Sequence, residues 1–250
     1  MSEEPIPAAT LVLFRNGRGA DEHLFVERAQ TMSFAAGAIV FPGGRVDAGD
    51  RLLATHFPAL DSDDAAARIA AIRETIEEAG VAVGFVTLPD AAQLATMRAQ
   101  LIEGMVFSDV VAAAGLSFDL SALTCFARWV PKLRQSRNFD TRFYIARFPD
   151  GSPMASVDAT ENVRLFWGTA QHVIDEADAG RVQVIFPTRR NLERLAKLGT
   201  FAAAEAEAAA IAPEIVAPWI EVRGSERYLR IARDRGYPVT EELMTSAVRG

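Results

Sequence analysis

The sequence has little of the chemistry that cysteine and histidine provide. It contains one cysteine, Cys125, and three histidines in 250 residues. One cysteine cannot form an internal disulfide, and with three scattered histidines it does not match a zinc cluster. We interpret Cys125, which lies in an apolar stretch, as a core residue and His56 as an exposed loop residue. The sequence therefore predicts neither a disulfide scaffold nor a zinc-binding domain.

Long apolar runs and an excess of basic charge are also missing. No stretch approaches the roughly 18 consecutive apolar residues of a membrane-spanning helix. The acidic start, MSEEPIPAAT, lacks the basic residues and apolar run of a signal peptide. The formal net charge of −7 argues against non-specific binding to nucleic acid or to anionic membranes. We expect a cytoplasmic protein with neither partner, although a local basic patch or a bound metal could still hold a phosphorylated small molecule.

Strand-like and helix-like segments are interleaved along the chain. The apolar runs 8–15 and 23–27 are joined by the turn NGRGADE and predict a hairpin. AIVFPGG, 38–44, predicts a strand that runs into a loop, and the residues up to about 64 are expected to be mostly irregular. Further strands are expected at VAVGFVT, SALTCFARWVP, TRFYIARFP and VRLFWGT, helices at 90–104, 107–114, 169–178, 187–199 and the alanine-rich segment from 201, and a hairpin within 218–237. The mixture predicts an α/β fold with a mixed β-sheet.

Three glutamates crowd the end of one predicted helix. In AAIRETIEEAGV, 70–81, Glu74, Glu77 and Glu78 share one side of a helix that stops at Gly80. The opposite side carries an apolar stripe that should face the core, formed by Ala65, Ile69, Ile72, Ile76 and Ala79. Carboxylates in the last turn of a helix cost about 0.3–1 kcal/mol each. Two interpretations remain open: a solvated helix face, or a site for a divalent cation such as Mg²⁺ or Mn²⁺.

The residues upstream of this helix complete a longer motif. Gly44 is followed after five residues by Asp50, and the helix then gives RETIEEAGV from Arg73 to Val81. This pattern resembles the motif of the Nudix hydrolases: Gly, five residues, Glu, seven residues, then Arg-Glu-aliphatic-x-Glu-Glu-x-Gly-aliphatic. Asp50 replaces the first glutamate of that motif, and Thr75 replaces an aliphatic residue. Residues 51–72 fill the gap that holds seven residues in the family.

The resemblance, which covers most of residues 8–200, implies a fold and a reaction. The fold is a Nudix-type α/β/α sandwich with a mixed β-sheet and helical elaborations, formed by residues 1–250 as a single domain. Residues 51–64 would be an insertion within the motif, and 200–250 a C-terminal elaboration. The reaction would be hydrolysis of a diphosphate linkage with Mg²⁺ or Mn²⁺. Family analogy also suggests a homodimer.

The resemblance also assigns roles to individual residues. Glu77 and Glu78 match the main metal ligands of the family, and Glu74 matches a further ligand or the catalytic base. Arg73 matches the residue that orients a glutamate, and Gly44 matches a position that contributes backbone to the metal site. Glu161, ahead of the strand VRLFW, is a candidate distal acid.

The stretch before the motif indicates which class of substrate to expect. LFVERAQTMSFAAGAIVFPGG, 24–44, is similar to the signature of the coenzyme A diphosphatase branch, with matches at Leu24, Arg28, Ala29, Gly37 and 41–44. Ser33 stands where the signature has a second arginine. The long insertion and FDTRFYIARFP resemble the acyl-CoA-active members. Arg28 is a candidate ligand of a substrate phosphate or forms a salt bridge at the rim of the site.

A basic cluster offers a second place for a phosphate. Arg142 is a further candidate substrate-binding residue, in a cluster that could receive a 3′-phosphate or form a solvated loop, with Lys132, Arg134 and Arg137. The leading hypothesis is hydrolysis of CoA or acyl-CoA to (acyl)phosphopantetheine and adenosine 3′,5′-bisphosphate. Two alternatives remain: a diphosphatase of ADP-ribose, dinucleotides or nucleotide sugars, and a non-catalytic nucleotide sensor.

Overall fold

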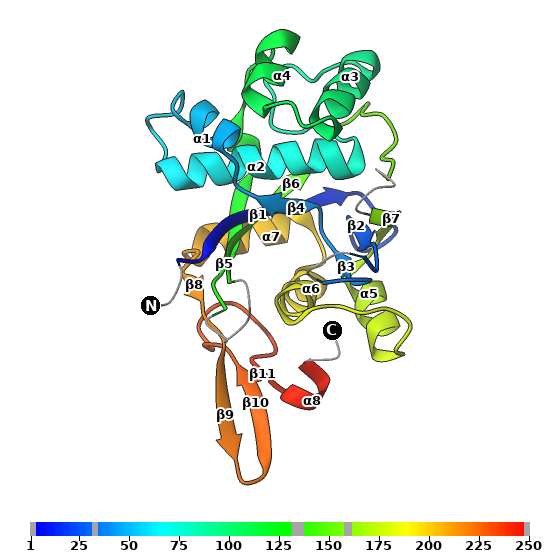
Figure 1. Cartoon of the computed structure of the whole chain (residues 1–250). Coiled ribbons are helices and arrows are strands. Elements are labelled where there is room, and N and C mark those ends of the chain that lie inside the picture. The colour runs from blue at the N-terminus through cyan, green and yellow to red at the C-terminus, as the bar shows by residue number, and fades with distance from the viewer. Residues whose placement is uncertain (1–3, 32–34, 132–137, 158–161, 248–250) are drawn as a thin grey trace.

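A mixed β-sheet lies between two layers of helices in the computed structural model, which describes residues 4–31, 35–131, 138–157 and 162–247 (Figure 1). The strands of this sheet are β1 (Ile6–Arg15), β2 (Glu22–Arg28), β3 (Ile39–Val40), β4 (Gly43–Arg45), β5 (Thr124–Trp129), β6 (Phe139–Arg147), β7 (Asn162–Gly168) and β8 (Ile215–Val216). Their order is β3-β2-β1-β6-β5-β8, and β4 and β7 pair with β1 and β2. The β1–β6 and β5–β8 pairs are parallel and the others antiparallel. The predicted mixed-sheet α/β/α fold is confirmed.

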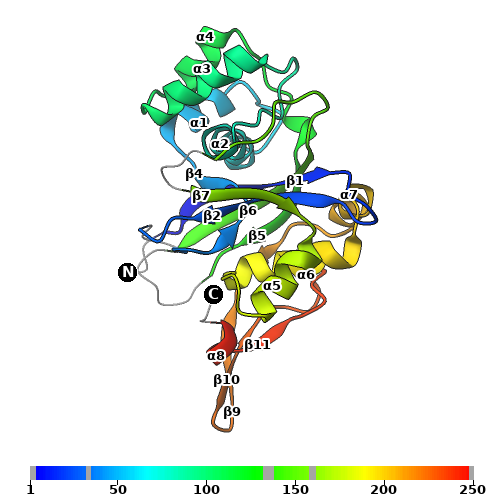
Figure 2. The ribbon, with the colours of Figure 1, turned by 90° about the vertical axis from the view of Figure 1, so that its right-hand side faces the viewer.

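Helices cover both faces of the sheet (Figure 2). One layer contains α1 (Ala48–Ala54), α2 (Ser62–Ala79), α3 (Ala91–Ile102) and α4 (Phe107–Ala114), and the other contains α5 (Ala170–Asp178), α6 (Phe186–Leu198) and α7 (Phe201–Ala210). Side chains alternate along each strand, so Leu11 and Leu13 pack with α2 whereas Val12 and Phe14 pack with the second layer. Each face of the sheet therefore has its own apolar core.

The acidic helix predicted from the sequence is α2. Asp61 caps its start by accepting a hydrogen bond from the Asp64 backbone N–H at 2.9 Å. Gly80 ends the helix in the left-handed conformation, at φ 63°. All five residues of the predicted apolar stripe are fully buried. The position of α2, its end at Gly80 and its buried face are therefore confirmed.

Three local predictions were wrong. Residues 48–54 form α1 rather than irregular chain, and this helix buries Leu53 and Ala54. VAVGFVT forms no strand beyond one bridge between Phe85 and Phe118, because Gly84 turns the chain at φ 73°. The glycine pair that was expected in a loop forms β4, which places Gly44 opposite Ala9 of β1.

The chain after β8 extends the fold away from the sheet. The strands β9 (Trp219–Arg223), β10 (Glu226–Arg230) and β11 (Glu241–Leu243) form a small antiparallel sheet, with the predicted hairpin at its centre, and α8 (Met244–Ala247) follows. Tyr237 attaches this region to the body by accepting a hydrogen bond from Trp129 Nε1 at 2.8 Å. In the described ranges, no helix has the length and apolarity that crossing a membrane requires.

Candidate active site

Two glutamates of α2 lie against the glycine pair of β4. The Gly43 backbone N–H donates a hydrogen bond to Glu78 Oε2 at 3.0 Å. The Glu74 carboxylate lies so close to Gly44 that a Cβ at that position would be 2.2 Å from Glu74 Oε1. Only glycine leaves room for a carboxylate so near the backbone. The structure thus brings together three of the residues that the sequence singled out: Gly44, Glu74 and Glu78.

Burial makes this pair of acids electrostatically costly. Glu78 is 3% exposed, and burial together with the charge of Glu74 raises its pKa well above the ordinary value. Burial also raises the pKa of Glu74, although Arg73 opposes the shift. A divalent cation beside both carboxylates would offset this cost.

The donor set fits a hard divalent cation. Among the residues that the structure describes, no group of three or more Asp, Glu, His or Cys side chains is arranged to hold a metal on its own. Mg²⁺, however, is commonly held by one or two carboxylates together with substrate phosphates and water. Glu74 and Glu78 provide two carboxylates, and oxygen ligands also suit Mn²⁺. The site therefore matches a cation that two carboxylates hold, with its other coordination positions open to water and to substrate phosphates.

Arg73 connects the acids to the chain upstream. Its Nη1 donates to Glu74 Oε1 at 2.9 Å and to Glu77 Oε1 at 3.1 Å. Its Nε and Nη2 donate to the fully buried Asp50 at 3.0 and 2.9 Å. Burial alone would lower the pKa of Arg73, but these acidic partners raise it above its ordinary value. Arg73 thus stays charged, and Glu77 lies beside Arg73 at the edge of the site.

The side chain of Asp50 is shorter than the glutamate of the family motif, but it still reaches Arg73. Asp50 lies in the first turn of α1, where it accepts a hydrogen bond from the Asp47 backbone N–H at 2.8 Å. Burial raises the pKa of Asp50 even though Arg73 opposes this. The aspartate is therefore held by α1, the helix that sequence reasoning missed.

Arg28 and Asn162 complete the surroundings of Glu78. Arg28 Nη1 lies 3.9 Å from Glu78 Oε1, and Arg28 Nε has no hydrogen-bond partner within the described part of the chain. The Asn162 side chain is 1% exposed and hydrogen-bonds Glu78, which moderates the rise in the pKa of Glu78. Sequence reasoning missed Asn162, because no local pattern marks it. The predicted distal acid, Glu161, precedes it and lies outside the described residues, as does Ser33.

Arg142 lies near the start of α2, away from the glutamates. Its Nη2 is 3.8 Å from Asp61 Oδ1, at the start of α2. Glu78 is 17 positions further along α2, roughly 25 Å at 1.5 Å per residue. The structure therefore does not bring Arg142 together with the glutamates. The rest of the predicted basic cluster, Lys132, Arg134 and Arg137, lies outside the described residues.

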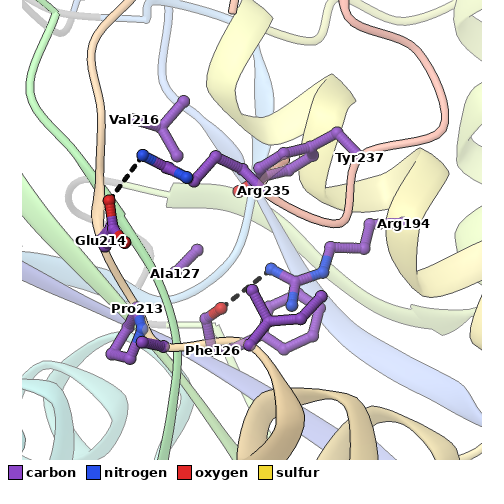
Figure 3. Close-up of a pocket in the computed structure, with 10 residues that line it drawn as sticks. Phe126, Ala127, Arg194, Pro213, Glu214, Val216, Arg235 and Tyr237 are labelled. Carbon is purple, nitrogen blue, oxygen red and sulfur yellow. Dashed lines mark hydrogen bonds and ion pairs between the residues drawn. The ribbon is translucent and has the colours of Figure 1, made fainter. Parts of the chain in front are cut away.

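The remaining predicted positions and a small cavity lie away from the glutamates. Cys125 packs partly buried against the core and His56 is exposed, as the sequence predicts. Figure 3 shows a cavity beside Arg194 and Tyr237, in the region where the C-terminal extension meets the second helical layer. Its volume of about 10 Å³ is close to what one water molecule needs. It is too small for a nucleotide-sized ligand.

Comparisons with known proteins agree with this geometry. The chain is similar to the crystal structure of a NUDIX hydrolase from Alicyclobacillus acidocaldarius, with 30% identity and a TM-score of 0.70. That comparison covers 81% of this chain and 96% of the other. No protein-family model matches the sequence.

Two curated proteins are also similar over part of their length. Putative nudix hydrolase 7 of Caenorhabditis elegans is 28% identical over 180 residues, and acyl-coenzyme A diphosphatase NUDT19 of Gallus gallus is 26% identical over 229 residues. Each comparison covers 70% of this chain. The chain spans only 56% and 61% of the length of these two relatives.

Proposed function

Since this chain belongs to the Nudix hydrolase family, we propose that it hydrolyses diphosphate linkages at the site where α2 meets β4. The observation that carries the proposal is the convergence of Glu74 and Glu78 on the glycine pair. Two neighbouring carboxylates with raised pKa values, one buried and one largely buried, are expensive in a purely structural role. Beside a divalent cation, the same two carboxylates hold the ion and thereby contribute to catalysis.

Each residue of the site has a part in this proposal. Glu74 and Glu78 hold Mg²⁺ or Mn²⁺, which when bound neutralises the diphosphate and activates water. Glu74, which Arg73 holds at 2.9 Å, accepts the proton of the attacking water. Glu77 is the third acid, kept at the edge of the site by Arg73. Arg28 donates to a phosphate of the substrate, for which its partly unpaired guanidinium is suited.

We further propose that the substrate is CoA or acyl-CoA, cleaved to (acyl)phosphopantetheine and adenosine 3′,5′-bisphosphate. The signature in residues 24–44 supports this, because it contains Arg28, which lies beside Glu78. The similarity to the acyl-coenzyme A diphosphatase of Gallus gallus gives further support. ADP-ribose, dinucleotides and nucleotide sugars are the alternative substrates within this reaction class. We expect a cytoplasmic enzyme, as a homodimer, that needs neither nucleic acid nor membrane.

A substrate panel tests this proposal. The protein is incubated with CoA, acetyl-CoA, ADP-ribose and NADH, with Mg²⁺, with Mn²⁺ and with EDTA, and the products are separated by liquid chromatography. We expect adenosine 3′,5′-bisphosphate from CoA and from acetyl-CoA, and none with EDTA. Cleavage of ADP-ribose but not of CoA would overturn the substrate assignment. No cleavage of any compound would favour the non-catalytic sensor.

The two glycines of β4 allow a matched pair of substitutions. Gly44→Ala brings a Cβ to 2.2 Å from the Glu74 carboxylate, which can move because it ends a flexible side chain. We expect kcat to fall at least about tenfold, since Glu74 is displaced, with little change in Tm. Gly43→Ala brings its Cβ to 2.4 Å from the backbone oxygen of Ala9, so it should separate β4 from β1 and destabilise the fold by about 1–3 kcal/mol. Wild-type kcat in Gly44→Ala would contradict the role of Glu74.

A further inference from the structure

The end of α2 that carries the glutamates receives an arginine from another helix. The last carbonyls of a helix have no partner within it and form its negative end. Arg98, on α3, donates from Nε to the backbone oxygen of Glu77 at 2.9 Å and from Nη2 to that of Glu78 at 3.2 Å. A cation therefore lies at the point where the helix dipole and the glutamates are both negative.

The same guanidinium also binds the connection between β6 and β7. Its Nη1 donates to Ser156 Oγ and its Nη2 to the Ser156 backbone oxygen, each at 2.7 Å. The Ser156 backbone N–H in turn donates to the Ala79 backbone oxygen at 2.9 Å. Three successive carbonyls at the end of α2 are thus held by α3 and by the segment that leads to Asn162, the residue that hydrogen-bonds Glu78.

Gly80 leaves the space that this arrangement requires. The residue has a φ of 63°, and a Cβ there would lie 2.9 Å from Arg98 Nη1. Arg98 therefore lies directly over the last turn of the helix. The hydrogen bonds that Arg98 donates to Glu77 and Glu78 are accepted by their main-chain oxygens.

We propose that Arg98 is a positioning residue for the divalent-cation site. It fixes the last turn of α2, so that Glu78, and with it Glu74 one turn earlier, presents its carboxylate to the glycine pair of β4. It also offsets the negative end of the helix, where carboxylates are otherwise disfavoured. This inference rests on the proposed function. The helix α3, which lies outside the Nudix motif, thereby supports α2, the helix that carries the glutamates.

The test compares three variants by their affinity for Mn²⁺, measured by isothermal titration calorimetry, and by kcat and KM for CoA. Arg98→Met should raise the Kd for Mn²⁺ about 10- to 100-fold, the loss typical of a residue that orients a metal ligand. It should lower kcat with little change in KM for CoA. Arg98→Lys should restore part of the affinity, because its ammonium group can still donate to the helix carbonyls.

Arg68→Met is the matched control. Arg68 is a part-buried arginine of α2. Near the start of the helix, it donates hydrogen bonds to Asp64 at 2.7 Å and to the Leu120 backbone oxygen at 2.9 Å. We expect Arg68→Met to lower Tm and to leave the Kd for Mn²⁺ unchanged. An Arg98→Met variant with the wild-type Kd, or an equal loss of affinity in Arg68→Met, would overturn the inference.

The outcomes separate this inference from the proposed function. If the wild-type protein binds no Mn²⁺, the proposed function fails and the inference fails with it. If the wild type binds Mn²⁺ and Arg98→Met binds it equally well, only the inference fails. Should Arg98→Met not fold, Ser156→Ala replaces it, since it removes one acceptor of Arg98. We then expect a several-fold rise in the Kd for Mn²⁺, and an unchanged Kd overturns the inference.

Discussion

Glu78→Gln is expected to abolish hydrolysis, with kcat at least about 10³-fold below the wild type. The loss should exceed the roughly 10- to 100-fold effect of residues that only support a metal ligand, because Glu78 is itself proposed to hold the cation. The amide is the same size as the carboxylate, and its oxygen can still accept the hydrogen bond from the Gly43 N–H. Steady-state kinetics with Mg²⁺ and with Mn²⁺ measures the effect.

The same substitution should leave the fold intact. Glu78 is almost fully buried, and burial together with the charge of Glu74 raises its pKa, so the carboxylate costs stability in the folded protein without a bound cation. Replacing it by a neutral amide should therefore leave Tm unchanged or slightly higher. Glu103→Gln, at an exposed position after α3, is the control and should keep wild-type kcat. Unchanged turnover in Glu78→Gln would refute its assignment as a metal ligand.

Arg73→Met is expected to have the largest effect on stability. It removes the cation that bonds the fully buried Asp50, and leaves Glu74 and Glu77 without their shared partner. Breaking a buried ion pair by removing one member typically costs about 3–5 kcal/mol, because the other charge remains buried and unpaired. We expect a loss of that size in the free energy of unfolding, measured by urea denaturation.

A second substitution separates the charge effect from lost packing. Adding Asp50→Asn to Arg73→Met removes the unpaired charge, so the double variant should recover part of the lost stability. Arg51→Met is the matched control on α1, since Arg51 forms an exposed ion pair with Asp63 at 2.9 Å and such pairs contribute about 0–1 kcal/mol. An Arg73→Met protein no less stable than Arg51→Met would contradict the role given to Arg73.

Local signals in the sequence were sufficient to predict α2. Gly80 ends the helix and the apolar stripe has helical spacing, so both signals lie within the helix or next to it. The crowding of glutamates was visible in the same way. The role of these glutamates was not visible, because a solvated helix face and a cation site have the same sequence pattern.

The contacts that decide between these interpretations join distant parts of the chain. Glu78 meets Gly43 across 35 positions, and periodicity says nothing about such a pair. The family resemblance supplied that connection. Asn162 and Arg98 do not belong to the motif, so only the fold reveals them.

Two errors in the predicted elements have local physical causes. The helix α1 is short and buries few apolar side chains, so its pattern is too weak to stand out among acids and turn residues. In VAVGFVT, the apolar run favours a strand, but Gly84 adopts a left-handed conformation and its Cβ-free backbone packs against Ile72. Tertiary packing therefore overrides the local preference.

A Mn²⁺ titration, followed by electron paramagnetic resonance of the free ion, tests the central claim most directly: that Glu74 and Glu78 together hold a divalent cation beside the glycine pair of β4. The wild type is compared with the double variant Glu74→Gln, Glu78→Gln. We predict that the wild-type protein binds Mn²⁺ at a tight site and that the double variant loses this site while keeping its fold. Equal binding by the two proteins would contradict the account.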